Sequence, residues 1–161
     1  MSLTSIKIVQ HKQRLDALFE KGTTLANDSE LLSNWAKYLC VLTSGFIEES
    51  VRVLLFEYVH KRSSPEVEHF VNSRLHFFQN AKMSNILDLL GEFSSEFRTQ
   101  MELLAQDELK DAVDSVVNNR HQISHGRPIG LSFMTIKDYY KRVVRTIECL
   151  EQVLSNSNHE R

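Results

Sequence analysis

The sequence is poor in glycine and proline, with five glycines and two prolines among its 161 residues. That scarcity argues against a loop-rich β-sandwich and excludes a collagen-type repeat. The apolar residues make up 42% of the chain, which is an ordinary share for a folded domain and excludes a disordered tail. We therefore expect helices to make up most of the chain.

Cysteine is also scarce, and long apolar runs are missing. Cys40 and Cys149 lie far apart inside apolar helical patterns, so we interpret them as buried free thiols, as found in a reducing compartment. No apolar run approaches the roughly 20 residues that a bilayer crossing needs, and the first residues lack the apolar core of a signal peptide. We expect a cytoplasmic protein without membrane contact.

Apolar residues recur at helical spacing along the whole chain. The predicted helices span about 4–24, 29–62, 65–78, 80–91, 95–124 with a break near 107, and 135–154. The signals for their ends are Asp28, Ser64 with Pro65, and Thr135 with Asp138 at N-termini, and Gly126 with Pro128 at a C-terminus. The sequence predicts one all-α domain over residues 1–161, an up-and-down helical bundle with short extra helices between the second and penultimate long helices.

Charge is distributed unevenly along this bundle. The whole chain has a net charge of −2, but residues 118–147 contain six basic residues and one acidic residue, and so carry +5. A basic segment on an acidic body marks where an anion would be attracted. The alternative is a solvated helix face with no ligand.

The segment from Asn118 to Gly126 concentrates side chains that handle phosphates and protons. Arg120 lies only about 20° around the helix from Val113, which places it on the apolar stripe. A buried, unpaired guanidinium costs several kcal/mol, so Arg120 must be paired or must face a cleft. His125 stands beside Gly126, where the chain can turn the imidazole towards that cleft. The alternative is an arginine paired with a core carboxylate and a histidine that caps the helix.

Other chemistries find less support. His121 and His125 are four residues apart and share a helix face, but no further Glu or Cys pair completes a zinc site, so we predict no metal. The chain also lacks a Walker-type phosphate loop, a G-x-G-x-x-G motif and a G-x-S-x-G elbow. These absences argue against P-loop nucleotide hydrolysis and serine hydrolase chemistry.

Arg120 and His125, with four residues between them and a polar residue directly after the arginine, resemble the R-x(4–6)-H motif of the HEPN superfamily. The motif also lies near the end of the penultimate long helix of a helical bundle, as in that family. Its extended form, Asn-Arg-x-x-Ile-Ser-His-Gly, is most similar to the RiboL-PSP branch.

The resemblance implies a metal-independent endoribonuclease that needs no cofactor and acts as a homodimer, with the two motifs facing each other across a two-fold axis. RNA can be cut without metal when its 2′-hydroxyl attacks the adjacent phosphorus, which requires a base, an acid and cations. Histidine can transfer protons at neutral pH, and arginine donates bidentately to phosphate. We assign proton transfer to His125 and phosphate binding to Arg120.

Further residues and partners follow from the same interpretation. Glu48 and Glu49 of the second helix could orient these groups, or could form a solvated face. A role as a toxin or phage-defence nuclease would add an antitoxin or nucleotidyltransferase partner to the RNA. The alternative function is a non-catalytic module that binds RNA, a nucleotide or a partner protein. The supporting or RNA-binding candidates are Asn119, His121, Ser124, Arg127, Lys141 and Arg145.

Overall fold

A computed structural model describes residues 2–157, so the domain predicted over 1–161 extends beyond the described residues at residue 1 and at 158–161. Within that range the chain forms seven α-helices and no strand, which confirms the all-α prediction. The helices are α1 (Ile6–Thr23), α2 (Ser29–His60), α3 (Pro65–His76), α4 (Met83–Phe93), α5 (Ser95–Leu104), α6 (Glu108–Ser124) and α7 (Phe133–Asn156).

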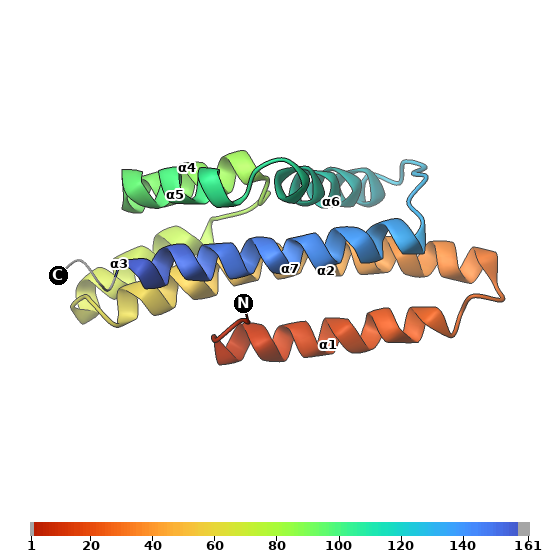
Figure 1. Ribbon diagram of the computed structural model, residues 1–161, viewed down its shortest axis with the longest axis horizontal. Helices are drawn as coiled ribbons and strands as arrows, with labels where there is room; N and C mark the ends of the chain where they lie inside the picture. Colours follow the sequence, from red (N-terminus) through yellow and green to blue (C-terminus); the bar gives the residue numbers. More distant parts are fainter. Residues whose placement is uncertain (1, 158–161) are drawn as a thin grey trace.

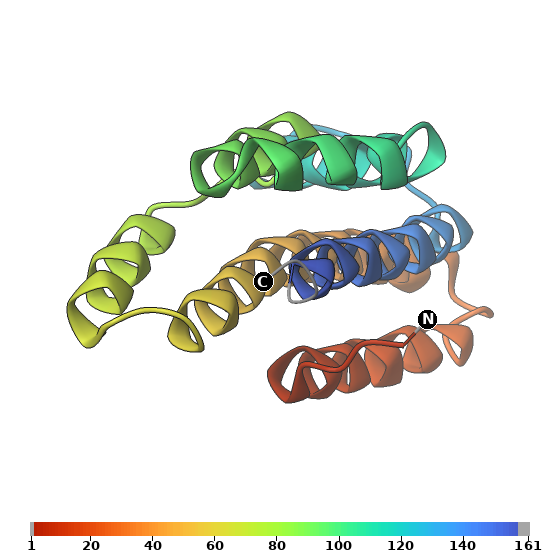
Figure 2. The same cartoon turned by 60° about the vertical axis from the view of Figure 1, so that its left-hand side comes forward.

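The two longest helices, α2 and α7, lie side by side in the middle of the molecule (Figure 1). Helices α4, α5 and α6 cover one side of this pair, and α1 covers the opposite side, as the rotated view also shows (Figure 2). Helix α2 contacts α1, α3, α6 and α7, and it therefore buries apolar residues on several faces. The bundle predicted from the sequence is thus built around α2 and α7.

Two predicted caps are present. The Asp28 carboxylate accepts a hydrogen bond from the Leu31 N–H at 2.9 Å at the start of α2. The Ser64 hydroxyl accepts one from the Val67 N–H at 3.5 Å ahead of α3. Side-chain caps of this kind satisfy backbone donors that the first helical turn leaves unpaired.

The start predicted for the last helix is wrong. Helix α7 begins at Phe133, and Ser132 is its N-cap, with its hydroxyl accepting from the Thr135 N–H at 3.1 Å. Asp138 takes no part in the cap, because its carboxylate pairs with Arg142 at 2.9 Å. Serine and threonine are both good caps, so the sequence alone did not distinguish two candidates three residues apart.

The helix predicted from residue 80 also begins later. Asn80 has a left-handed backbone, with φ of 55°, and its N–H donates to the Glu48 carboxylate of α2 at 3.0 Å. Helix α4 instead starts at Met83, whose N–H donates to the Asp114 carboxylate of α6 at 2.8 Å. The cap therefore comes from a distant helix, which no local pattern reveals. The break predicted near residue 107 is confirmed, since Asp107 has φ of 48° between α5 and α6.

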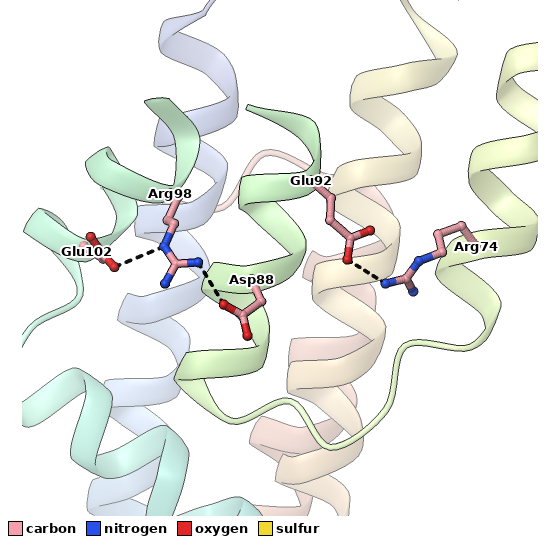
Figure 3. A network of polar contacts seen from close by, with 5 residues as sticks. All are labelled: Arg74, Asp88, Glu92, Arg98 and Glu102. Carbon is pink, nitrogen blue, oxygen red and sulfur yellow. Dashed lines mark hydrogen bonds and ion pairs between the residues drawn. The ribbon is translucent and has the colours of Figure 1, made fainter. Parts of the chain in front are cut away.

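Ion pairs hold the α3, α4 and α5 helices together on the outside of the molecule. Arg98 of α5 bridges Asp88 of α4 at 2.8 Å and Glu102 at 3.3 Å, and Arg74 of α3 contacts Glu92 of α4 at 2.8 Å (Figure 3). Such exposed pairs contribute roughly 0–1 kcal/mol each, so they guide the arrangement more than they stabilise it. The Arg74–Glu92 pair joins α3 and α4, the two helices on either side of the loop that contains Asn80.

The two cysteines differ in how deeply they are buried. Both are free, but Cys40 is buried and Cys149 is only half-buried. Burial raises the pKa of the Cys40 thiol to about 12, and the thiol donates to the Val116 carbonyl at 3.5 Å. Among residues 2–157, no helix is both long and apolar enough to span a bilayer.

Candidate functional site

Helix α6, which contains the predicted motif, ends in a Schellman turn. His125 is the C-cap, and Gly126 follows with φ of +66°. The Gly126 N–H donates to the Ile123 carbonyl, and the Arg127 N–H donates to the Gln122 carbonyl, both at 3.0 Å. Gly126 therefore ends the helix as predicted. The turn fixes the backbone of His125, the C-cap that directly follows α6.

A hollow of about 350 Å³, which we call the α2/α6 cleft, lies beside this helix end. Three separate segments form it: the middle of α2, the loop at residues 80–82, and the last two turns of α6. Its lining residues are Ser44, Glu48, Asn80, Lys82, Val117, Asn118, Arg120 and His121.

Arg120 lies in this cleft with an exposed side chain, and it makes no ion pair with any other residue in 2–157. The prediction that it lies on the apolar stripe is wrong, because the buried stripe of α6 ends at Val117. Beyond that point α6 faces polar residues of α2, Ser44 and Glu48, across the cleft. The sequence left two possibilities for the guanidinium, an ion pair or a cleft. Within the described residues, Arg120 faces a cleft.

The motif histidine, His125, touches the supporting candidate His121 at the rim. Their ring centroids are 4.4 Å apart in an edge-on arrangement, and both side chains are exposed. His121 lines the cleft, whereas His125 contacts it only through His121. The Ser124 hydroxyl donates to the His121 carbonyl at 2.9 Å. Among residues 2–157, no group of three or more His, Cys, Asp or Glu side chains is placed to hold a metal ion.

The two glutamates of α2 singled out in the sequence, Glu48 and Glu49, differ in position. Glu48 lines the cleft, where its carboxylate accepts from Asn80 and lies 3.9 Å from Arg52. Glu49 points to another face, where it contacts Arg52 at 3.5 Å and borders a hollow shared with Lys7. Only Glu48 is therefore placed to orient groups in the cleft.

Sequence reasoning missed three lining residues, namely Ser44, Asn80 and Lys82. Lys82 is half-buried and, like Arg120, forms no ion pair within the described part of the chain. It lies far from the motif in sequence, so spacing along one helix gives no signal for it. Asn80 gives a weak signal, since asparagine adopts left-handed backbone more readily than other non-glycine residues.

The basic segment at 118–147 does not form one surface. Arg142 faces α6 and pairs with Asp138, while Arg127 is exposed and donates to Gln122 at 3.1 Å. Lys141 and Arg145 line a second hollow, between α1 and α7, so the structure does not bring these two RNA-binding candidates to the cleft; Asn119 is half-buried outside the cleft lining. We call that second hollow, of about 450 Å³, the α1/α7 groove. It is lined by Lys12, Asp16, Phe19, Glu20, Lys137, Tyr140, Lys141, Val144 and Arg145.

Comparison with known proteins bears on the family. No curated protein and no solved structure matches the chain. The family model described as RiboL-PSP-HEPN matches residues 7–156, from the second residue of α1 to the last residue of α7. Because the match spans nearly the whole chain, and because the fold is helical throughout the described residues, this protein belongs to the RiboL-PSP-HEPN family.

Proposed function

We propose that this protein is a metal-independent endoribonuclease that cleaves RNA at the α2/α6 cleft. The observation that carries the proposal is the exposed Arg120 guanidinium, which makes no ion pair with a described residue and shares the cleft with Lys82. Arg120 near the end of α6 and Lys82 on the facing loop, neither of them in an ion pair with a described residue, suit a phosphate under attack beside the histidines of α6.

In the proposed reaction the RNA 2′-oxygen forms a bond to the adjacent phosphorus as the bond to the 5′-oxygen breaks. A base takes the 2′-hydroxyl proton, and an acid gives a proton to the departing 5′-oxygen. Arg120 binds two phosphoryl oxygens through its planar fork, and Lys82 adds a second positive charge. The negative charge that builds on the phosphoryl oxygens is thereby stabilised.

His125 is the residue we assign to proton transfer, since it is exposed and its ring touches His121, which lines the cleft. His121 contacts the His125 ring edge-on and so restricts its orientation. Glu48 acts at a distance, because its carboxylate holds the backbone of Asn80 and thus the loop that supplies Lys82. Asn119, Ser124 and Arg127 lie around these residues in sequence and are assigned to RNA contact.

We propose further that the active form is a homodimer, in which the second copy supplies the second histidine. The exposed face of α2 supports this arrangement. Tyr38 and Val41 are 46% and 38% exposed there, and a Cβ placed on Gly45 would meet no atom within 4 Å. Two α2 helices packed along this face would bring the adjoining clefts together across a two-fold axis.

The family also suggests the biological setting, which we propose as a cytoplasmic toxin or phage-defence nuclease. A nuclease of this kind is restrained by an antitoxin or works with a nucleotidyltransferase. Among the described residues, the cleft lining contains phosphate-binding groups and, apart from the His121 imidazole, no aromatic ring on which a base could stack.

The test is cleavage of single-stranded and hairpin RNA in excess EDTA, with analysis of the product ends. We expect 2′,3′-cyclic phosphate or its hydrolysis product, and we expect His125→Ala to abolish cleavage while RNA binding persists. His69→Ala, which removes an exposed histidine from α3, is the matched control. Products with 5′-phosphate ends, or activity that chelation removes and Mg²⁺ restores, would contradict the mechanism. RNA binding without any cleavage would favour the non-catalytic alternative.

The same assay across a dilution series, with the mass followed by sedimentation, tests the dimer. The cleavage rate should fall in step with the dimer fraction. Val41→Arg should lower both, whereas Val67→Arg, at an exposed valine of α3, should lower neither. A monomer that cleaves at the full rate per chain rules out the composite site.

A further inference from the structure

The α1/α7 groove has one basic wall. Lys137, Lys141 and Arg145 follow one another at intervals of four residues along α7, so their side chains line one edge of that helix. None of the three makes an ion pair with another residue among 2–157, in contrast to Arg142 on the same helix, which is paired with Asp138. The wall therefore has charge to offer a ligand.

The opposite wall, from α1, has a different character. Lys12 and Asp16 pair with each other at 2.7 Å, and Asp16 also accepts a hydrogen bond from the Tyr140 hydroxyl at 2.7 Å. Glu20 is exposed and, within the described residues, has no ion-pair partner. The groove thus has a positive edge on α7 and a neutral to negative edge on α1.

Its floor is apolar and closed. Phe19 and Tyr140 stack on each other with ring centroids 4.4 Å apart, and they are only 4% and 5% exposed. Val144 completes the floor and is half-buried. Since neither ring presents a free face, nucleic-acid bases have nothing to stack on here.

We propose that the α1/α7 groove binds an amphipathic, acidic helix of a partner protein. The partner's apolar side chains would lie over this floor, chiefly against the half-buried Val144, since Phe19 and Tyr140 are already buried. Its carboxylates, spaced four residues apart, would meet Lys141 and Arg145, which have the same spacing. The basic wall from Lys137 to Arg145 is about 12 Å long, which matches two turns of helix.

A single-stranded RNA fits the groove less well than such a helix. Its phosphates would lie near the carboxylates of Glu20 and Asp16 as well as near the basic wall, whereas a helix can place acidic residues on one flank and other residues on the opposite one. The proposal therefore goes beyond the proposed nuclease function, and it does not depend on whether the cleft cuts RNA.

The test uses a designed, fluorescein-labelled helical peptide with leucines on one face, glutamates along one flank and alanines along the other. We expect fluorescence anisotropy to show saturable binding to the full chain that weakens as salt increases. The double variant Lys141→Glu/Arg145→Glu should weaken binding by about tenfold or more. The matched control is Lys61→Glu, a charge reversal at an exposed lysine outside the groove.

A second peptide, with lysines in place of the glutamates, distinguishes charge-dependent binding from non-specific hydrophobic binding. We expect it not to bind. Equal affinity for both peptides, or an affinity that the double variant leaves unchanged, overturns the proposal. If the acidic peptide fails to bind and a single-stranded RNA oligonucleotide loses affinity in the double variant, the groove is an RNA-binding surface instead. Circular dichroism of each variant checks that the fold is retained.

Discussion

The α2/α6 cleft and the α1/α7 groove lie on different sides of the central α2–α7 pair, and both contain cations without ion-pair partners among the described residues. They differ in what surrounds those cations. The cleft is lined by polar side chains, with Val117 as its only apolar lining residue within the described part of the chain. The groove has a floor of stacked aromatic rings.

This difference separates two kinds of anion. A small, strongly hydrated group such as a phosphodiester suits the cleft, because polar walls can replace its water. An acidic protein segment suits the groove, because burying its apolar face supplies affinity that exposed charges alone do not. Net charge counted over a stretch of sequence hides this distinction, since Lys137, Lys141 and Arg145 of α7 line the groove whereas Arg120 of α6 lines the cleft.

Among the changes that compare the two hollows, the largest effect is expected from Arg120→Lys. Lysine keeps the charge but loses the bidentate fork, so the cleavage rate should fall by about 10²-fold, or on the order of 3 kcal/mol in the barrier. The groove variant Lys141→Glu/Arg145→Glu should cleave at the wild-type rate in the same single-turnover assay. A parallel loss in both variants would mean that the two hollows serve one function, and a lysine variant with near wild-type turnover would exclude the proposed role of Arg120.

A smaller effect is expected from Lys82→Gln. This change removes the second cation of the cleft but leaves Arg120 and both histidines, so cleavage should slow by about tenfold, or roughly 1.4 kcal/mol. Raising the salt concentration should narrow the difference from wild type, because a point charge is screened. The control is Lys61→Gln, at an exposed lysine just after α2 and outside the cleft lining. Equal rates for Lys82→Gln and wild type would show that Lys82 does not act on the phosphate.

The smallest effect is expected on stability, in the pH dependence that His11 of α1 contributes to unfolding. Burial, helped by the nearby Arg14, lowers the pKa of His11 from its usual 6.5, and its ring packs edge-on against Phe46 of α2. The unfolded chain therefore binds more protons than the folded chain just below pH 6.5, so stability is lost as the pH falls from there towards the folded-state pKa.

When the pH is lowered from neutral to mildly acidic, the urea midpoint should therefore fall less in His11→Gln than in wild type. The measurement is urea unfolding followed by circular dichroism at both pH values. His69→Gln, at an exposed histidine of α3, should behave like wild type. An identical acid shift in all three proteins would exclude His11 as a source of the pH dependence.

The sequence predicted those parts of the fold that depend on local patterns. Helical periodicity located every helix, and Asp28, Ser64 and Gly126 marked ends that the structure confirms. Two predicted helix starts were wrong. The helix predicted from residue 80 begins at Met83, whose N–H donates to the distant Asp114, and the helix predicted from residue 135 begins after a competing cap, Ser132.

The candidate site shows the same limit. The motif on α6 could be found because its residues share one helix end, and Glu48 was singled out as a charge within an apolar helix. Lys82 could not be found, because it approaches Arg120 only through the fold of α3 and α4. The exposure of Arg120 was missed for a related reason, since the length of a buried stripe depends on which residues of α2 face it.

The position of α7 has a consequence for how the protein is made. Both walls of the cleft, α2 and α6, pack against α7, which comes after them in chain order. A ribosome therefore releases the cleft-forming helices before the helix that holds them together. The two walls also pack directly on each other, but because domains fold as units once their core is complete, the full arrangement of α2, α6 and α7 forms only after α7 has been synthesised. A nascent chain that stops short of α7 therefore lacks the helix on which α2 and α6 both pack, and the faces of α2 and α6 that contact α7 in the finished protein stay uncovered.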